Sequence, residues 1–76
     1  MQVVQVYGRE RLEVIGAVVT ALQRSGKVTL LWLLGEKPRV YRLGDGYYGV
    51  SGERARLVVR LNGNGKAEII NVAVKG

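Results

Sequence analysis

The sequence contains no cysteine and no histidine, and Asp45 is its only aspartate. Without cysteine, the chain has no disulfide, no thiolate nucleophile and no zinc site of the usual Cys/His kind. Without histidine, acid–base chemistry near neutral pH depends on five glutamates, four lysines and four tyrosines. We therefore expect a protein that is not an enzyme and that needs no metal or cofactor.

Long apolar runs are also missing. The longest run, residues 28–34, spans seven residues, whereas a membrane-spanning helix needs about 20. The N-terminus shows no signal-peptide pattern. We therefore expect a soluble, cytoplasmic protein.

The chain is short and strongly basic. Its 76 residues predict a single compact domain, residues 1–76. A domain of this size buries only ~60% of the surface of its unfolded chain, so self-association would stabilise it, and we expect a homodimer. The abundance of arginine, the lack of cysteine and the single aspartate also hint at a thermophilic source.

Twelve lysines and arginines outnumber six acidic residues, which gives a formal charge of +6 and a pI near 10.2. Such a balance favours a polyanionic partner, although it also serves solubility. Eight of the twelve cations are arginine, which pairs with phosphate in a bidentate manner and stacks on bases. The composition therefore favours binding to nucleic acid.

Two elements are predicted at the start of the chain. Residues 3–7 are β-branched and aromatic and end at Gly8, which indicates a short strand. Residues 9–24 then carry apolar side chains along one arc of a helical wheel and polar ones along the other. This pattern predicts an amphipathic helix with Gly8 as its N-cap and Gly26 as the left-handed residue after its end.

Residues 27–34 fit a helix or a strand by periodicity alone. Their short length and the flanking glycines, Gly26 and Gly35, favour a strand buried on both faces. Trp32 would then lie in the core or in a subunit interface. A right-handed crossover would make this strand a parallel neighbour, or near neighbour, of the first.

Two hairpins follow. Residues 39–43 and 47–50 flank the turn Gly44-Asp45-Gly46, and residues 54–61 and 66–74 flank Asn62-Gly63-Asn64-Gly65. A turn centred on residues 63–64 would place Leu61 opposite Lys66 and Leu57 opposite Ile70. We therefore expect an α+β fold in which strand, helix, strand and two β-hairpins form one mixed sheet, with the single helix packed on one face.

Two groups of basic residues are candidates for phosphate binding. Arg9 and Arg11 lie in the first turn of the predicted helix, where free backbone N–H groups favour anions. Arg54, Arg56 and Arg60 alternate along one strand and would share one face, with Lys66 near the hairpin tip. The alternative for each group is an ordinary solvated surface.

Aromatic and basic residues mix in the first hairpin. Tyr41, Tyr47 and Tyr48 lie near Arg39 and Arg42, a combination found where single-stranded bases stack. Tyrosines in strands are more often structural, and adjacent Tyr47 and Tyr48 must face opposite sides. We therefore favour packing for the tyrosines and keep the two arginines as candidate contacts.

Part of the chain resembles a known family. A short strand at residues 4–7, Gly8 followed by Arg9, an apolar helix, Gly26 and an apolar run at residues 28–34 are similar to the small archaeal Alba chromatin proteins. The final strand, residues 69–75, also resembles theirs. The resemblance implies a dimeric, largely sequence-independent DNA- or RNA-binding protein with hairpin arms, in which Arg9 stands at the basic loop and Arg60 or Lys66 in the arm.

The sequence thus predicts a small basic homodimer that binds DNA or RNA mainly through phosphates. The alternative is a structural or protein-interaction module that uses exposed sheet edges and has no role with nucleic acid. The predicted contacts are Arg9, Arg11, Arg39, Arg42, Arg54, Arg56, Arg60 and Lys66.

Overall fold

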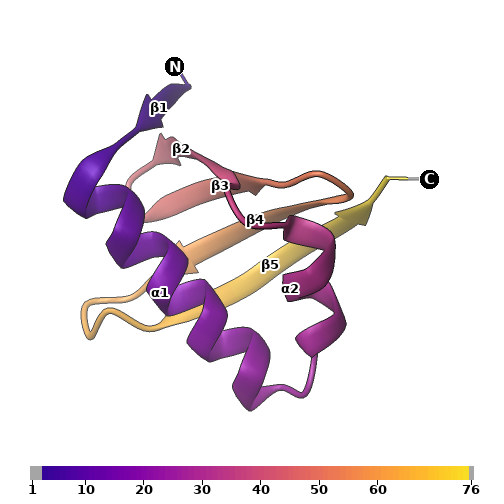
Figure 1. Cartoon of the computed structure of the whole chain (residues 1–76). Coiled ribbons are helices and arrows are strands. Elements are labelled where there is room, and N and C mark those ends of the chain that lie inside the picture. The colour runs from indigo at the N-terminus through magenta and orange to yellow at the C-terminus, as the bar shows by residue number, and fades with distance from the viewer. Residues whose placement is uncertain (1–2, 76) are drawn as a thin grey trace.

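A computed structural model describes residues 3–75 and shows two layers, a sheet and a helical layer (Figure 1). The helices are α1 (Gly8–Arg24) and α2 (Val28–Leu34). The strands are β1 (Val4–Val6), β2 (Arg39–Gly44), β3 (Tyr47–Ser51), β4 (Ala55–Leu61) and β5 (Ala67–Val74). The expected α+β class and both predicted hairpins, β2–β3 and β4–β5, are confirmed.

The five strands form one antiparallel sheet in the order β1-β2-β3-β4-β5. The prediction of a mixed sheet with parallel first and second strands is wrong. It depended on a strand at residues 27–34 that would return the chain to the sheet. The strand that pairs with β1 is instead β2, and it runs antiparallel to it.

Residues 28–34 form helix α2, so the prediction of a single helix is also wrong. Four of its seven residues are leucine, a good helix former, and its β-branched residues, Val28 and Thr29, are confined to the first turn. Gly26 ends α1 with a φ of 72°, as predicted, and reverses the chain. The resemblance to the Alba proteins assigns a strand to this stretch, where the structure has α2.

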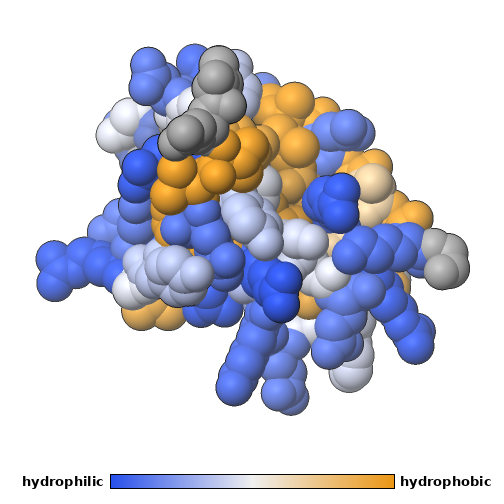
Figure 2. Space-filling model, turned by 90° about the horizontal axis from the view of Figure 1, so that it is seen from above, coloured by the Kyte–Doolittle hydropathy of each residue, from blue (hydrophilic) through white to orange (hydrophobic). Residues whose placement is uncertain are grey.

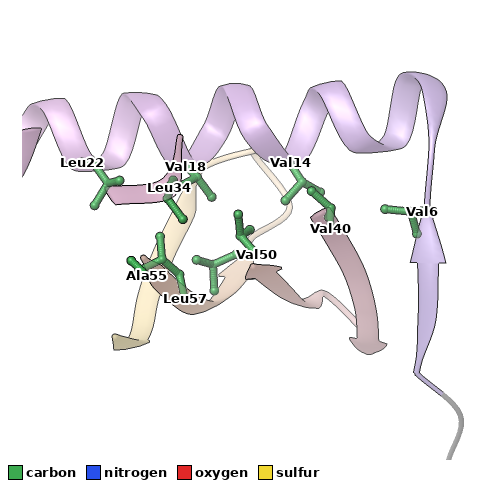
Figure 3. Packing of buried hydrophobic residues seen from close by; sticks show 10 residues of the cluster. Val6, Val14, Val18, Leu22, Leu34, Val40, Val50, Ala55 and Leu57 are labelled. Atoms are coloured by element: carbon green, nitrogen blue, oxygen red, sulfur yellow. The ribbon is translucent and has the colours of Figure 1, made fainter. Parts of the chain in front are cut away.

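The core lies between α1 and the sheet (Figure 3). Val14, Val18 and Leu22 are buried at intervals of four residues along the inner face of α1. They meet buried side chains from the strands and from α2: Val6, Leu34, Val40, Val50, Ala55, Leu57 and Val59. Each valine or leucine of this core contributes about 1.5–3 kcal/mol when it is fully buried.

The turn between β3 and β4 holds the end of α2. The backbone N–H groups of Glu53 and Arg54 donate to the carbonyls of Leu34 and Leu33, at 3.3 and 2.8 Å. Gly52 lies so close to the helix that an added Cβ would stand 2.4 Å from the Leu34 Cα. These contacts satisfy carbonyls that a helix end leaves unpaired, and they seat Leu34 in the core.

Trp32 is 82% exposed, so its predicted place in the core is wrong. In a helix, Leu34 can face inward while Trp32, two residues earlier, faces outward. A strand buried on both faces would have covered it. The other prediction for Trp32, a place in a subunit interface, stays a prediction.

The second hairpin differs in register from the prediction. Residues 62–66 form a longer turn in which the Asn62 Oδ1 accepts hydrogen bonds from the N–H groups of Asn64 and Lys66. Leu61 therefore pairs with Ala67 instead of Lys66. A β-bulge at Ile70 then places Leu57 opposite Val72, and Ile69 replaces Ile70 on the face that α1 covers.

Candidate nucleic-acid interface

The helices cover one face of the sheet and leave the other face open. Because side chains alternate along a strand, the neighbours of the buried residues point to this open face. Three rows of paired positions cross it, and we call their residues the open face. They are Arg39, Ser51, Arg56 and Ala73; then Gln5, Tyr41, Gly49, Val58 and Asn71; then Tyr47, Arg60 and Glu68.

A hollow of about 370 Å³ lies over the middle row. Gly49 stands between Tyr41 on β2 and Val58 on β4 and is buried. The Leu43 side chain lies against it, 3.6 Å from where a Gly49 Cβ would stand. The lining is mostly apolar and comes from Val3, Tyr41, Leu43, Gly49, Ser51, Arg56, Leu57 and Val58.

Basic side chains gather at one end of this hollow. Arg39 and Arg56 flank Ser51 in the first row. Beyond them, a more polar depression of about 290 Å³ is lined by Lys37, Arg39, Ser51, Gly52, Glu53 and Lys75. The exposed Arg54 immediately precedes β4 at the same turn. One carboxylate, Glu53, lines this depression beside three cations, so the end of the face carries positive charge.

Tyr47 and Arg60 occupy the other end of the open face. They are paired positions on β3 and β4, and the Arg60 guanidinium lies 6.0 Å from the centre of the Tyr47 ring. This arrangement is a cation–π contact at the edge of its useful range. Tyr47 remains 40% exposed, so its ring is accessible to a ligand.

Within residues 3–75, the only ion pair joins Arg42 to Glu10. Arg39, Arg54, Arg56 and Arg60 therefore form no ion pair with a carboxylate of these residues, although Glu68 is the paired position of Arg60 on β5. Figure 2 shows the molecule from above. Long hydrophilic side chains project from its outline, beside a hydrophobic area. Cations that are not neutralised by neighbours are able to meet phosphates.

Arg42 lies on the helix-facing side of β2, two residues from the buried Val40. Its Nε donates to the Glu10 Oε2 at 3.0 Å, its Nη2 donates to Oε1, and the Tyr48 hydroxyl donates to Oε2 at 2.9 Å. Hydrogen bonds from Arg42 and then Tyr48 lower the pKa of the Glu10 carboxyl below its ordinary value of 4.5. Partial burial, followed by the bond to Glu10, raises the pKa of Tyr48. These hydrogen bonds connect α1 to β2 and β3.

The remaining predicted residues belong to the helical side of the molecule. Arg9 is exposed in the first turn of α1, whereas Arg11 is half-buried and its Nη2 donates to the Pro38 carbonyl at 3.0 Å. Lys66 lies beside α1, where it lines a depression of about 290 Å³ together with Arg24. The structure therefore does not bring Arg9, Arg11 and Lys66 together with the arginines of the open face.

Lys37 and Lys75 were missed by the sequence reasoning. Neither follows a strand pattern with the arginines, and they lie 38 positions apart in the chain. The antiparallel sheet brings both to the turn between β3 and β4. Tyr47 and Tyr48 do face opposite sides of β3, as predicted, because Tyr48 reaches Glu10 whereas Tyr47 lies by Arg60.

Neither α1 nor α2, the helices of residues 3–75, combines the length and apolar character needed to cross a bilayer. No known protein family, no curated protein and no solved structure matches this chain.

Proposed function

We propose that this protein binds nucleic acid, DNA or RNA, mainly through its phosphates and with little dependence on sequence. The observation that carries the proposal is the open face, where Arg39, Arg56 and Arg60 form no ion pair with any carboxylate of residues 3–75. Guanidinium groups suit phosphate because they donate two parallel hydrogen bonds and keep their charge. The net charge of +6 would draw a polyanion toward this face.

Two of the arginines predicted as contacts are already engaged by other groups. Arg42 is held by Glu10 and Arg11 by the Pro38 carbonyl, so neither group is placed to meet phosphate. Arg9 and Lys66 are exposed on the helical side. The contacts we propose are Arg39, Arg54, Arg56, Arg60, Lys37 and Lys75.

Binding should fall steeply with salt, because each phosphate contact releases counterions. We expect the double variant Arg56→Ala/Arg60→Ala to bind about tenfold more weakly than the wild type. The slope of log affinity against log salt concentration should decrease by about 1.4 for a single strand. Fluorescence anisotropy with labelled oligonucleotides measures both quantities.

The matched control is Arg24→Ala/Lys27→Ala, which removes the same charge from exposed positions of the helical layer. It should leave the salt slope unchanged. Equal losses in the two double variants would assign the binding to net charge and contradict a dedicated face. No retention of single-stranded or duplex nucleic acid at low salt would contradict the proposed function itself.

We further propose that the protein acts as a homodimer through α2. Trp32 and Val28 are 82% and 47% exposed on this helix. They border an apolar depression of about 280 Å³ that Leu31, Gly35 and Glu36 also line. Exposed tryptophan at the centre of an apolar surface is typical of protein interfaces.

The alternative function, recruitment of a partner through sheet edges, has less support. Strand β5 forms one edge of the sheet and exposes Ile70 and Val74. It is interrupted by the bulge at Ile70, and the Asn71 Oδ1 accepts a hydrogen bond from the Val72 N–H at 2.9 Å. Both features reduce the ability of an edge to accept another strand.

A further inference from the structure

We infer that the open face takes single-stranded nucleic acid, with unpaired bases lying on Tyr41 and Tyr47 and in the hollow that Tyr41 lines. This inference rests on the proposed function, because it assumes that phosphates meet the arginines of the same face. Phosphate contacts alone do not determine whether the bound nucleic acid is single-stranded or duplex, and this inference specifies a single strand.

The first observation is the position of the two tyrosines. Tyr41 pairs with Gly49, and Tyr47 lies two residues before Gly49 on β3. The two tyrosines are therefore diagonal neighbours on one face. Aromatic rings spaced along a strand surface can stack successive bases of one chain.

The second observation is the hollow beside Tyr41, which extends toward Ser51 and Arg56 and is not lined by Tyr47. It measures about 370 Å³ and is lined by Tyr41, Leu43, Gly49 and Val58 among others. Its floor is apolar, which suits the flat face of a base and does not suit a phosphate. The arginines stand at its borders: Arg56 lines it, and Arg60 lies over Tyr47 at the next row.

Cationic and aromatic side chains thus alternate over a short distance on the open face. Bases in a duplex have their faces covered by neighbouring pairs, so they cannot lie flat on a tyrosine ring. Unpaired bases expose these faces, and every base has one, which agrees with binding that is independent of sequence. The open face therefore fits a single strand with its bases toward the sheet and its phosphates toward the arginines.

The sharpest test compares two probes that carry the same charge. One is a fluorescein-labelled oligothymidylate of about 10 nucleotides, and the other is an abasic strand with the same number of phosphates. Wild-type protein should bind the oligothymidylate about 10-fold or more tightly than the abasic strand, because only the former can stack. A duplex of similar length should also bind more weakly than the oligothymidylate.

Variants test the residues. Tyr41→Ala/Tyr47→Ala should weaken binding to oligothymidylate by about 10-fold or more and leave binding to the abasic strand unchanged. The matched control is Tyr7→Ala, which removes a tyrosine that is 69% exposed just before α1. It should bind both probes as the wild type does.

Gly49→Ala provides a second variant that keeps the strand intact. A Cβ at this position makes only ordinary contacts, the nearest being Leu43 at 3.6 Å. The added methyl group would narrow the hollow, so binding to oligothymidylate should fall while binding to the abasic strand and the thermal unfolding temperature are retained.

The outcomes separate the two proposals. If wild-type protein binds the abasic strand as tightly as oligothymidylate, or if the tyrosine variant keeps full affinity, this inference is overturned while phosphate binding stands. If wild-type protein binds none of the three probes at low salt, the proposed function fails and takes this inference with it.

Discussion

The eight arginines differ more in what their side chains contact than in where they lie in the sequence. Arg39 and Arg42 are three residues apart on β2, yet Arg39 borders the open face and Arg42 is bound to Glu10 on the other side. Glu10 also accepts a hydrogen bond from Tyr48 on β3. One carboxylate therefore connects the first turn of α1 to two strands, and its protonation should affect stability.

We expect Glu10→Gln to lower the stability of the fold at neutral pH, because the neutral amide replaces a carboxylate that accepts charge-assisted hydrogen bonds. The pKa of Glu10 is lowered in the folded state, from an ordinary value of 4.5. Its stabilising effect is therefore complete above pH 4.5 and is lost as the pH falls through the folded-state pKa. Urea unfolding at a series of pH values measures both effects.

Glu13→Gln is the matched control for this change. Glu13 lies one turn further along α1 and is exposed. Glu13→Gln should keep the wild-type dependence of the free energy of unfolding on pH. In Glu10→Gln, this free energy should fall less steeply as the pH becomes acidic. The same fall at acidic pH in wild type and Glu10→Gln would show that the contacts of Glu10 are not formed in solution.

Elements meet at a few close contacts that determine how they pack. The clearest is the turn between β3 and β4, where Gly52 lies against the backbone of Leu34 at the end of α2. The turn also supplies the N–H groups that pair with the carbonyls of Leu33 and Leu34. Helix α2 is only seven residues long, so its helical state depends on such tertiary contacts.

Gly52→Ala should destabilise the protein by about 1–3 kcal/mol, the usual cost of forcing extra volume into a packed site. The added Cβ would stand 2.4 Å from both the Cα and the carbonyl oxygen of Leu34, so backbone must move. Chemical denaturation gives the free energy of unfolding, and far-ultraviolet circular dichroism reports any loss of helix.

Gly16→Ala adds the same methyl group at a position where no other atom is close. An added Cβ at Gly16, within α1, meets no atom within 4 Å. This variant should be more stable than the wild type by up to about 1 kcal/mol, because alanine favours a helix over glycine. Equal stability of Gly52→Ala and wild type would show that the turn does not pack on α2 as described.

The whole molecule has two surfaces with different chemistry. The open face is basic and aromatic, whereas α2 on the helical side presents Trp32 and Val28. With α2 as the dimer contact, the open faces of both copies would remain accessible to nucleic acid. Self-association and nucleic-acid binding should therefore be separable by substitution.

Trp32→Glu should weaken the dimer by at least about 10-fold, because a buried interface tryptophan commonly contributes 2 kcal/mol or more. The change should not disturb folding, since Trp32 is 82% exposed in the single chain. Sedimentation velocity over a range of concentrations measures the dissociation, with Tyr7→Ala as the control for loss of an exposed aromatic residue. A monomeric wild-type protein at every concentration would contradict the proposed dimer.

Much of the fold follows from local patterns. The amphipathic period of residues 9–24 predicts α1, glycine and asparagine predict both hairpins, and alternation places Arg56 and Arg60 on one face. The pattern could not decide between strand and helix for residues 28–34, because a short apolar run suits either. The four leucines in this run were the available signal for a helix.

The sequence by itself determined the basic charge, the first helix, the hairpins and the alternation along β4, because these depend on residue type and on periods of a few residues. Tertiary structure alone decided that α2 is a helix, that Arg42 but not Arg39 forms an ion pair within residues 3–75, and that Lys37 and Lys75 line one depression. It also decided that Tyr41, Tyr47 and Gly49 share one open surface. These outcomes depend on contacts between residues far apart in the chain, and no local period encodes such contacts.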